Sequence, residues 1–298
     1  MVRCRTLLLM LVPAVVLIFI FNYVPMYGVI IAFKKFNYSA GLLGSPWVGL
    51  QNFEFFFREG GDWWHVTRNT VLYNIAFLFI NTFLQLVFAM VLSELTSRWF
   101  KKISQTLMLL PYFLSWVVVG AIAFNLFSYE RGFINSFIGM FGMDPIDVYA
   151  SPGMWPVILI LFNVWKGVGY STVVYLAAIT GLDAEILEAA EIDGANIFQR
   201  MRHITLPSIM PTIIILLLLN IGSLFRGDFG MFWNLTGNNG RLYSTTDIID
   251  TYIYRGLQRA GGMESSAAVG LYQSLLCFIT IILANFLVRK YDKDYALF

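Results

Sequence analysis

Long uncharged runs are the feature that most limits what this chain can fold into. Five stretches contain no Asp, Glu, Lys, Arg or His, and each exceeds the roughly 20 residues that a helix needs to cross a bilayer core. A sixth stretch holds a single charge, Lys166. Backbone groups in hydrocarbon must be paired within their own segment, and these runs lack the alternation of barrel strands. The sequence therefore predicts an all-α polytopic membrane protein, a single transmembrane domain over 1–298, with six transmembrane helices at about 6–33, 69–95, 104–128, 155–180, 207–226 and 266–288.

The composition narrows the class further. Hydrophobic residues make up 58% of the chain and charged residues 13%, which is about half the charged share of a soluble domain. A net charge of +2 offers no basic field for nucleic acid. Two cysteines are too few for a disulfide scaffold or a thiolate metal site, so we predict no metal site. The first run continues to Phe33, beyond the length of a signal peptide, and we interpret it as a retained helix.

Lysine and arginine positions predict the orientation. If the N-terminus lies inside, the inner segments have about twice the density of positive charge of the outer loops, which favours both termini in the cytoplasm. The inner charges would be Arg3, Arg5, Arg98, Lys101, Lys102, Arg200, Arg202, Arg289, Lys290 and Lys293.

The inner linker at about 181–207 differs from the other connections because it has helix signals of its own. Asp183 can cap a helix, Glu185 lies where the helix dipole favours an anion, and Gly194 can end the helix in a left-handed conformation. The pattern predicts a short amphipathic helix over 184–193. A helix of this length is marginal alone in water and needs a partner surface. That surface is either the chain's own helical bundle or a separate cytoplasmic protein.

The residues of this linker resemble a known signature. Its parts are Glu188-Ala189-Ala190, Asp193-Gly194-Ala195, Ile204-Thr205-Leu206-Pro207 and Pro211, and their spacing is similar to the EAA motif of binding-protein-dependent ABC-importer permeases. Other segments are similar to the carbohydrate-importing branch and its polysaccharide or oligosaccharide permease subgroup: Pro25-Met26-Tyr27-Gly28, Gly49-Leu50-Gln51-Asn52-Phe53, Asn69-Thr70, Leu110-Pro111, Gly132-Phe133-Ile134-Asn135 and Trp165-Lys166-Gly167-Val168-Gly169.

This resemblance implies a specific machine. The fold would be that of a type I ABC importer permease, in the cell membrane, importing an oligosaccharide or polysaccharide fragment. The short helix would fit a groove on a cytoplasmic ATPase, with the bend at Gly194, and the coupling residues would be Glu188, Ala189, Ala190, Asp193, Gly194, Leu206 and Pro207. The expected partners are a second, related permease, two ATPase subunits and an extracellular solute-binding protein.

The chain lacks the motifs of an ATPase or a protease. It has no Gly-Lys dipeptide and therefore no phosphate loop, so ATP and Mg²⁺ would be bound by a separate ATPase and no cofactor is expected on this chain. It also lacks His-Glu-x-x-His and Gly-x-Ser-x-Gly, so we predict a transporter subunit and not an enzyme. The alternatives are an ATP-independent secondary transporter or channel for a small polar solute and, more weakly, an intramembrane enzyme.

Candidate pathway residues come from polar side chains inside the spans. Asn163, Lys166 and Tyr170 share a helical face that could line an aqueous path for a hydroxyl-rich ligand. Snorkelling of the lysine, or its bonding to a neighbouring helix, is the alternative. Asn220 is a further candidate, and Trp116 could stack on a sugar ring, although packing explains it equally well. Amides in the second span that line a path or bond between helices are Asn74, Asn81 and Gln85.

Overall fold

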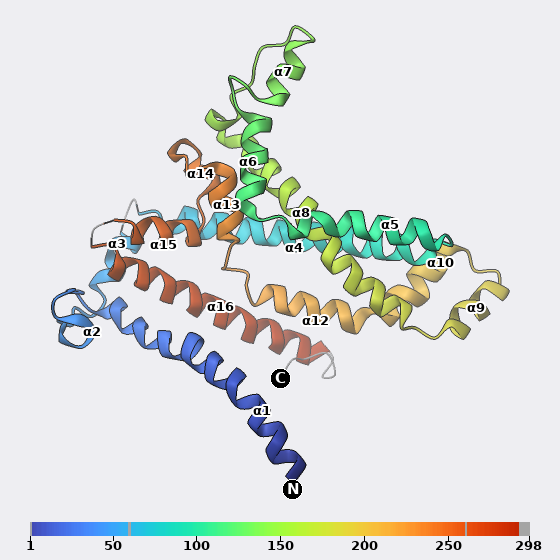
Figure 1. Cartoon of the computed structure of the whole chain (residues 1–298), viewed down its shortest axis with the longest axis horizontal. Coiled ribbons are helices and arrows are strands. Elements are labelled where there is room, and N and C mark those ends of the chain that lie inside the picture. The colour runs from blue at the N-terminus through green and yellow to red at the C-terminus, as the bar shows by residue number, and fades with distance from the viewer. Residues whose placement is uncertain (1, 59–60, 260, 292–298) are drawn as a thin grey trace. The chain divides into compact units, whose positions relative to one another are not determined.

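The computed structural model describes residues 2–58, 61–259 and 261–291, and its regular structure is helical (Figure 1). The chain divides into two compact units. Residues 1–64 and 252–275 form the first, and residues 65–251 and 276–298 form the second. Three helices, α4, α15 and α16, pass from one unit into the other.

The first unit begins with one long apolar helical run. Helix α1 (Val2–Ile18) continues into a π-helical turn, η1 (Phe19–Tyr23), and a 3₁₀ segment, η2 (Val24–Phe33). The change to 3₁₀ geometry coincides with Pro25, which has no N–H to donate to an α-helical bond. The unit also contains α2 (Gly41–Gly44), α3 (Gln51–Phe57), the first two residues of α4, the end of α15 and the first part of α16. Phe56 is buried and packs against the rings of Tyr252 and Tyr272.

The second unit contains the remaining elements of the described chain. These are α4 (Trp63–Glu94), α5 (Arg98–Leu109), η3 (Leu110–Phe113), α6 (Trp116–Phe127), α7 (Phe133–Gly139), η4 (Val148–Ala150), η5 (Pro152–Met154), α8 (Trp155–Thr180), α9 (Ala184–Ile192), α10 (Ile197–Arg200), η6 (Met201–Thr205), α11 (Leu206–Ser208), α12 (Met210–Ile221), α13 (Phe229–Thr236), η7 (Gly240–Leu242), α14 (Tyr243–Thr246), α15 (Ile249–Leu257) and α16 (Met263–Tyr291).

Two apolar clusters hold the second unit together. One surrounds the fully buried Trp155 and joins α4, α6, α8 and α13 through residues such as Tyr73 and Phe232. The other joins α4, α8 and α12 around Tyr175 and Ile209. Helices α5 and α8 approach so closely that a Cβ at Gly169 would overlap the carbonyl of Met108. This glycine is therefore required by packing.

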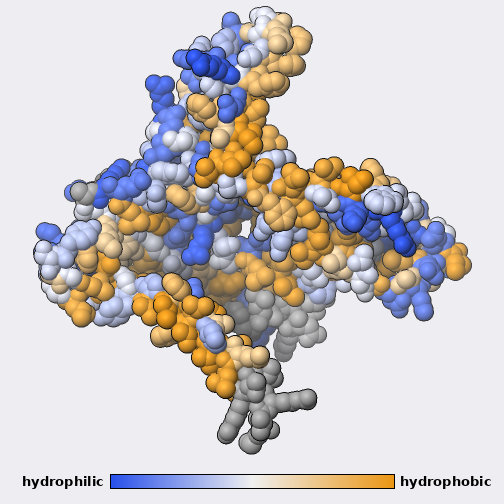
Figure 2. Space-filling model, viewed as in Figure 1, coloured by the Kyte–Doolittle hydropathy of each residue, from blue (hydrophilic) through white to orange (hydrophobic). Residues whose placement is uncertain are grey.

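Four helices of the described chain are long and apolar enough to cross a membrane: Leu8–Phe33, Trp63–Glu94, Pro152–Thr180 and Met263–Lys290. The count rises to six if each of two bent helix pairs is one span. Apolar side chains cover the surface of such segments, as Figure 2 shows along α1 and around α6. This exposure is expected of helices that face lipid.

The helix expected over 104–128 is not continuous. The segments Arg98–Phe113 and Trp116–Phe127 meet at 94°. Pro111 lacks an N–H, Leu114 is extended, and the Ser115 side chain accepts a bond from the N–H of Val118 to start α6 afresh. The sequence contained these signals, but the apolar run outweighed them in the prediction.

The helix expected over 207–226 also differs from the structure. The chain bends by 61° between Ile197–Ser208 and Met210–Ile221, next to Pro207 and Pro211, and α12 ends at Ile221. A turn then leads to α13, which packs closely against α6. The polar residues after Ile221 are therefore folded back into the second unit.

Candidate functional site

The 181–207 segment begins with a capped helix. Asp183 is extended and its carboxylate accepts a bond of 3.0 Å from the N–H of Glu185, so the N-cap predicted from the sequence is present. Helix α9 ends at Ile192, one residue before the predicted end. Glu185 lies in the first turn, where the helix dipole favours an anion.

Gly194 sets the end of α9. Its φ of +82° is the left-handed conformation predicted for it, and no atom lies within 4 Å of a Cβ built there. The N–H of Gly194 donates to Glu191 O at 3.1 Å, and the N–H of Ala195 donates to Ala190 O at 2.9 Å. This pair of bonds is a Schellman motif, which requires the positive φ at this position. The constraint on Gly194 is thus in the backbone and not in packing.

A second capped helix follows within two residues. The Asn196 side chain accepts a bond of 2.9 Å from the N–H of Gln199, and the Gln199 side chain accepts one of 2.8 Å from the N–H of Asn196. This reciprocal pair is a capping box, and it fixes the start of α10. Both ends of the turn between α9 and α10 are therefore held by local hydrogen bonds.

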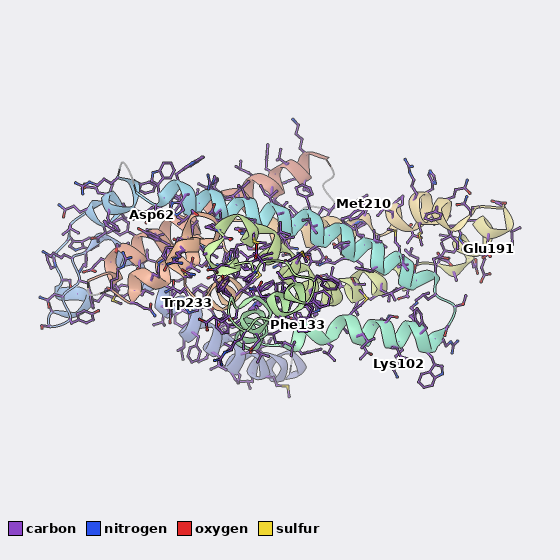
Figure 3. The ribbon with its side chains drawn as sticks, turned by 90° about the horizontal axis from the view of Figure 1, so that it is seen from above. Asp62, Lys102, Phe133, Glu191, Met210 and Trp233 are labelled. Carbon is purple, nitrogen blue, oxygen red and sulfur yellow. The ribbon has the colours of Figure 1, made fainter. Side chains whose placement is uncertain are left out.

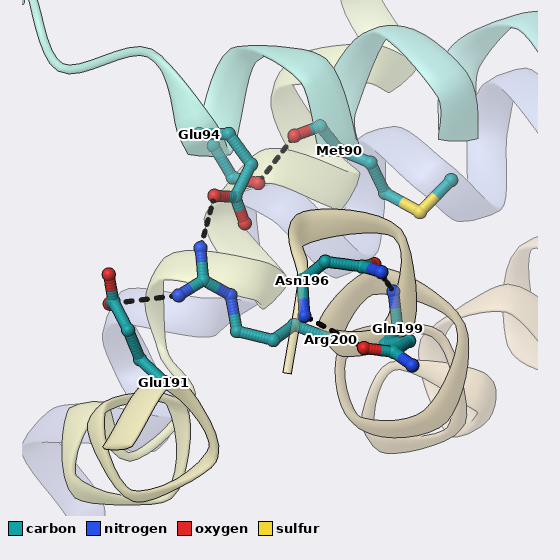
Figure 4. Close-up of polar contacts among 7 residues, drawn as sticks. Met90, Glu94, Glu191, Asn196, Gln199 and Arg200 are labelled. Carbon is teal, nitrogen blue, oxygen red and sulfur yellow. Dashed lines mark hydrogen bonds and ion pairs between the residues drawn. The ribbon is translucent and has the colours of Figure 1, made fainter. Parts of the chain in front are cut away.

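Arg200 ties this turn to a membrane helix, and the sequence analysis did not identify it as a structural link (Figure 4). One of its guanidinium nitrogens lies 2.8 Å from a Glu191 carboxylate oxygen, and the other lies 3.0 Å from a carboxylate oxygen of Glu94, the last residue of α4. The Arg200 side chain is 12% exposed, Glu94 25% and Glu191 72%. Because Glu94 and Arg200 are 106 positions apart, no sequence spacing marks this contact.

The outer face of the segment carries unusual apolar exposure. No residue of α9 is buried, Ile192 is 87% exposed, and Phe198 on α10 is 81% exposed. The exposed coupling residues include Glu188, Ala189, Asp193 and Pro207, whereas Ala190 and Leu206 are half-buried. A polar segment with isolated apolar side chains at its tip has the composition of a protein-docking surface.

The C-terminal side of the segment joins the membrane helices directly. Leu206 packs against the cluster around Tyr175 and Ile209, which belongs to α4, α8 and α12. Before it, the π-helical turn η6 and the buried Thr205 continue α10 without a flexible linker. A displacement of α9 and α10 would therefore be transmitted to three helices at once.

A polar cavity of about 380 Å³ lies elsewhere in the second unit, and we call it the amide cavity. Its lining includes Asn74, Asn81, Gln85, Asn163, Ser171, Asn220, Ser223, Arg226 and Asp228. The Asn81 amide donates a bond of 2.7 Å to Asn163 Oδ1, while the buried Oδ1 of Asn81 has no partner among the described residues. Free acceptors and donors in such a cavity suit a hydroxyl-rich ligand.

The other pathway candidates lie in a separate cluster. Lys166 Nζ donates a bond of 2.8 Å to the Tyr112 carbonyl and lies 5.2 to 5.3 Å from the ring centroids of Trp116 and Tyr112. Tyr170 stacks on Tyr112 with the ring centroids 4.8 Å apart. These contacts join α8 to the break between α5 and α6, where a carbonyl would otherwise lack a donor. Of the predicted pathway residues, the structure brings Asn163 and Asn220 to the amide cavity, and Lys166, Tyr170 and Trp116 to this cluster.

The sequence analysis missed Arg226 and Asp228 as lining residues. Asp228 caps α13 by accepting from the Met231 N–H at 3.0 Å, and it also accepts a bond of 2.6 Å from the Trp116 indole. Both residues follow an apolar run, so the sequence placed them in an outer loop. Only the fold-back of α13 onto α6 brings them to the cavity.

Comparisons with known proteins agree on the character of the chain. Residues 85–293 match the family described as the binding-protein-dependent transport system inner membrane component. The chain is 35% identical, over 99% of its length and 91% of the relative's, to the polygalacturonan/rhamnogalacturonan transport system permease protein YteP of Bacillus subtilis. A chain in the crystal structure of a bacterial ABC transporter involved in import of the acidic polysaccharide alginate superposes with a TM-score of 0.87 at 29% identity, covering 97% of each chain.

A second structure of a bacterial alginate transporter contains an alginate pentasaccharide-bound periplasmic protein. A chain of that complex superposes with a TM-score of 0.86 at 30% identity, over 98% of this chain and 96% of the other.

Proposed function

The chain belongs to the inner membrane components of binding-protein-dependent transport systems, and from this premise we propose that it imports an oligosaccharide or polysaccharide fragment across the cell membrane. It is a multi-pass permease subunit with the type I ABC importer fold, and in these systems ATP is hydrolysed by a separate subunit. The saccharide substrate is supported by the names of its relatives, which transport polygalacturonan, rhamnogalacturonan and alginate.

The 181–207 segment is the coupling element of this proposal. The observation that carries it is a helix with fixed ends whose tip exposes Ile192 and Phe198 to solvent. Glu188, Ala189, Ala190, Asp193 and Gly194 would enter a groove of the ATPase, and Leu206 and Pro207 would pass its movement to the membrane helices. Small residues permit close approach of the partner, and the carboxylates would meet its basic groups.

We further propose that the chain is a single permease domain that crosses the membrane six times, with both bent helix pairs inside it and both termini in the cytoplasm. The distribution of lysine and arginine supports this topology. Lys102 and Glu191 lie toward the same end of the second unit, and Trp233 lies away from that end (Figure 3). A common end for Lys102 and the 181–207 segment agrees with a shared cytoplasmic side.

The complete transporter would contain a second, related permease, two ATPase subunits and an extracellular solute-binding protein. One chain provides only part of a path, and the amide cavity would face the path shared with the second permease. ATP and Mg²⁺ would bind to the ATPase, and we assign no cofactor to this chain.

Reconstitution tests the proposal. Proteoliposomes that contain this chain, its partner permease, the ATPase and the binding protein should take up oligosaccharide only when ATP is supplied inside. Equal uptake by this chain alone without ATP would contradict it and favour a secondary transporter or channel. Failure of the ATPase to co-purify with the chain would contradict the coupling role.

Cysteine labelling tests the topology. In a background without Cys4 and Cys277, cysteines placed at Ser104 or Ser208 should resist a membrane-impermeant maleimide in intact cells, and cysteines at Asp144 or Asn238 should react. Reaction at Ser208 in intact cells would contradict a cytoplasmic coupling segment.

A further inference from the structure

The first unit contains a cavity of about 500 Å³ between α3, the chain just before it and the connection from α15 to α16. Two aromatic residues, Phe55 and Tyr252, and two amides, Gln51 and Asn52, line it. Three cations also line it: Lys35, Arg255 and Arg259. Its volume is within the range of ligand sites, and no role in the proposed coupling uses it.

The charge in this cavity is unbalanced. Glu264 is the one carboxylate among the described lining residues, and its Oε1 already accepts a bond of 2.9 Å from the N–H of Phe36. Lys35 and Arg259 are exposed, and neither pairs with a carboxylate of the described chain. Three cations against one engaged carboxylate make the cavity a site for an anion.

The neighbouring Lys34 shows that this arrangement is specific to one of two adjacent lysines. Lys34 is buried, and its Nζ donates to the carbonyls of Leu42 at 2.8 Å and Leu43 at 3.0 Å. It also lies 4.9 Å from the ring centroid of Trp47. Lys34 therefore serves the loop itself, whereas Lys35 reaches the cavity.

The lining indicates the class of anion. An arginine guanidinium binds a carboxylate with two parallel hydrogen bonds, amides bind hydroxyls, and an aromatic face packs against the apolar face of a pyranose. Arg255 lies 6.0 Å from the Tyr252 ring centroid, so cation and aromatic surface are presented together. We propose that this cavity binds a uronate residue of an acidic oligosaccharide. This inference rests on the proposed function and narrows its substrate class.

The same lining disfavours a neutral sugar. Burying the cations against a ligand without charge would remove their hydration and return no ion pair. Two similar proteins also transport acidic polymers by name, polygalacturonan in one and alginate in the other. The cavity thus acts as a charge filter that accepts uronates in preference to neutral saccharides.

Saturation-transfer NMR on the purified permease–ATPase complex, without binding protein, tests this with trigalacturonate as the probe. The fully methyl-esterified trimer is the neutral control of equal length. The unmodified complex should bind the acid and bind the ester about tenfold more weakly, and the double variant Lys35→Gln, Arg259→Gln should bind the acid about tenfold more weakly. Raising the salt concentration should weaken the binding of the acid alone.

Matched controls are Arg131→Gln and Arg241→Gln, which remove exposed arginines from the second unit and should leave binding unchanged. Unchanged binding of trigalacturonate by the double variant would overturn the proposal. So would a variant that keeps trigalacturonate binding and loses only stimulation by the binding protein, because the cations would then contact that protein. ATP-dependent uptake by the unmodified complex, measured in parallel, separates failure of this site from failure of the proposed function.

Discussion

The 181–207 segment and the amide cavity are stabilised by opposite kinds of interaction. The segment is exposed, and its helix ends are fixed by bonds between residues at most five positions apart, such as Asp183 with Glu185 and Ala195 with Ala190. The cavity is assembled by residues far apart in the chain, such as Asn81 and Asn163. A locally fixed, exposed element can move as a rigid piece against a partner, whereas a cavity built from several helices changes shape when those helices move.

The largest expected effect breaks the local side of this comparison. Gly194→Val places a β-branched side chain at a φ of +82°, which costs about 1 to 2 kcal/mol and opposes the Schellman motif. We expect ATP-driven uptake in proteoliposomes to fall by about tenfold or more while the amount of inserted permease is unchanged. Gly194→Asn is the control, because asparagine tolerates the left-handed region and should retain most of the uptake. Equal uptake by all three proteins would show that the turn geometry does not matter for coupling.

The next effect tests the long-range contact that the segment does have. Arg200→Gln leaves the carboxylate of Glu94, 25% exposed, without its partner and should destabilise the complex by about 1 to 3 kcal/mol. Glu191→Gln should change stability by less than about 1 kcal/mol, since this carboxylate is 72% exposed. Thermal unfolding of the purified complex and the ATPase activity stimulated by binding protein measure both. Equal losses in the two variants would contradict a specific tie between α10 and α4.

A smaller effect is expected in the amide cavity. Asn163→Leu removes the acceptor for the Asn81 amide and one polar group of the lining. Uptake per assembled complex should fall by about fivefold, a cost of about 1 kcal/mol that is typical of one interhelical hydrogen bond. Binding-protein docking should be unaffected. A loss of assembly with normal uptake per complex would instead assign Asn163 to structure alone.

The smallest effect is expected at Lys166. Lys166→Leu removes the donor to the Tyr112 carbonyl and the contacts with two rings, so complex yield should fall modestly, by about 1 kcal/mol of stability. Uptake per assembled complex should remain normal, in contrast to Asn163→Leu. Quantifying yield and uptake on the same preparation distinguishes them. Reduced uptake with full yield would place Lys166 on the pathway after all.

The same contrast explains what the sequence could predict. The cap at Asp183 and the bend at Gly194 are local, so residue types at short spacing were enough to predict them. The long apolar helices followed from composition, but the break near Pro111 did not, because one proline and a serine cap were outweighed by the apolar run. Arg226 and Asp228 joined the cavity only through tertiary packing of α13, for which no periodicity in the sequence gives a signal.

Site-specific photo-crosslinking tests the central claim most directly. A benzoylphenylalanine at Phe198, 81% exposed on α10, should crosslink to the ATPase in the assembled transporter, and one at Phe141, 69% exposed beyond α7, should not. The yield at Phe198 should change between the nucleotide-free and ATP-bound states, because the segment moves with its partner. Absence of any ATPase crosslink at Phe198 in a complex that hydrolyses ATP would contradict the account.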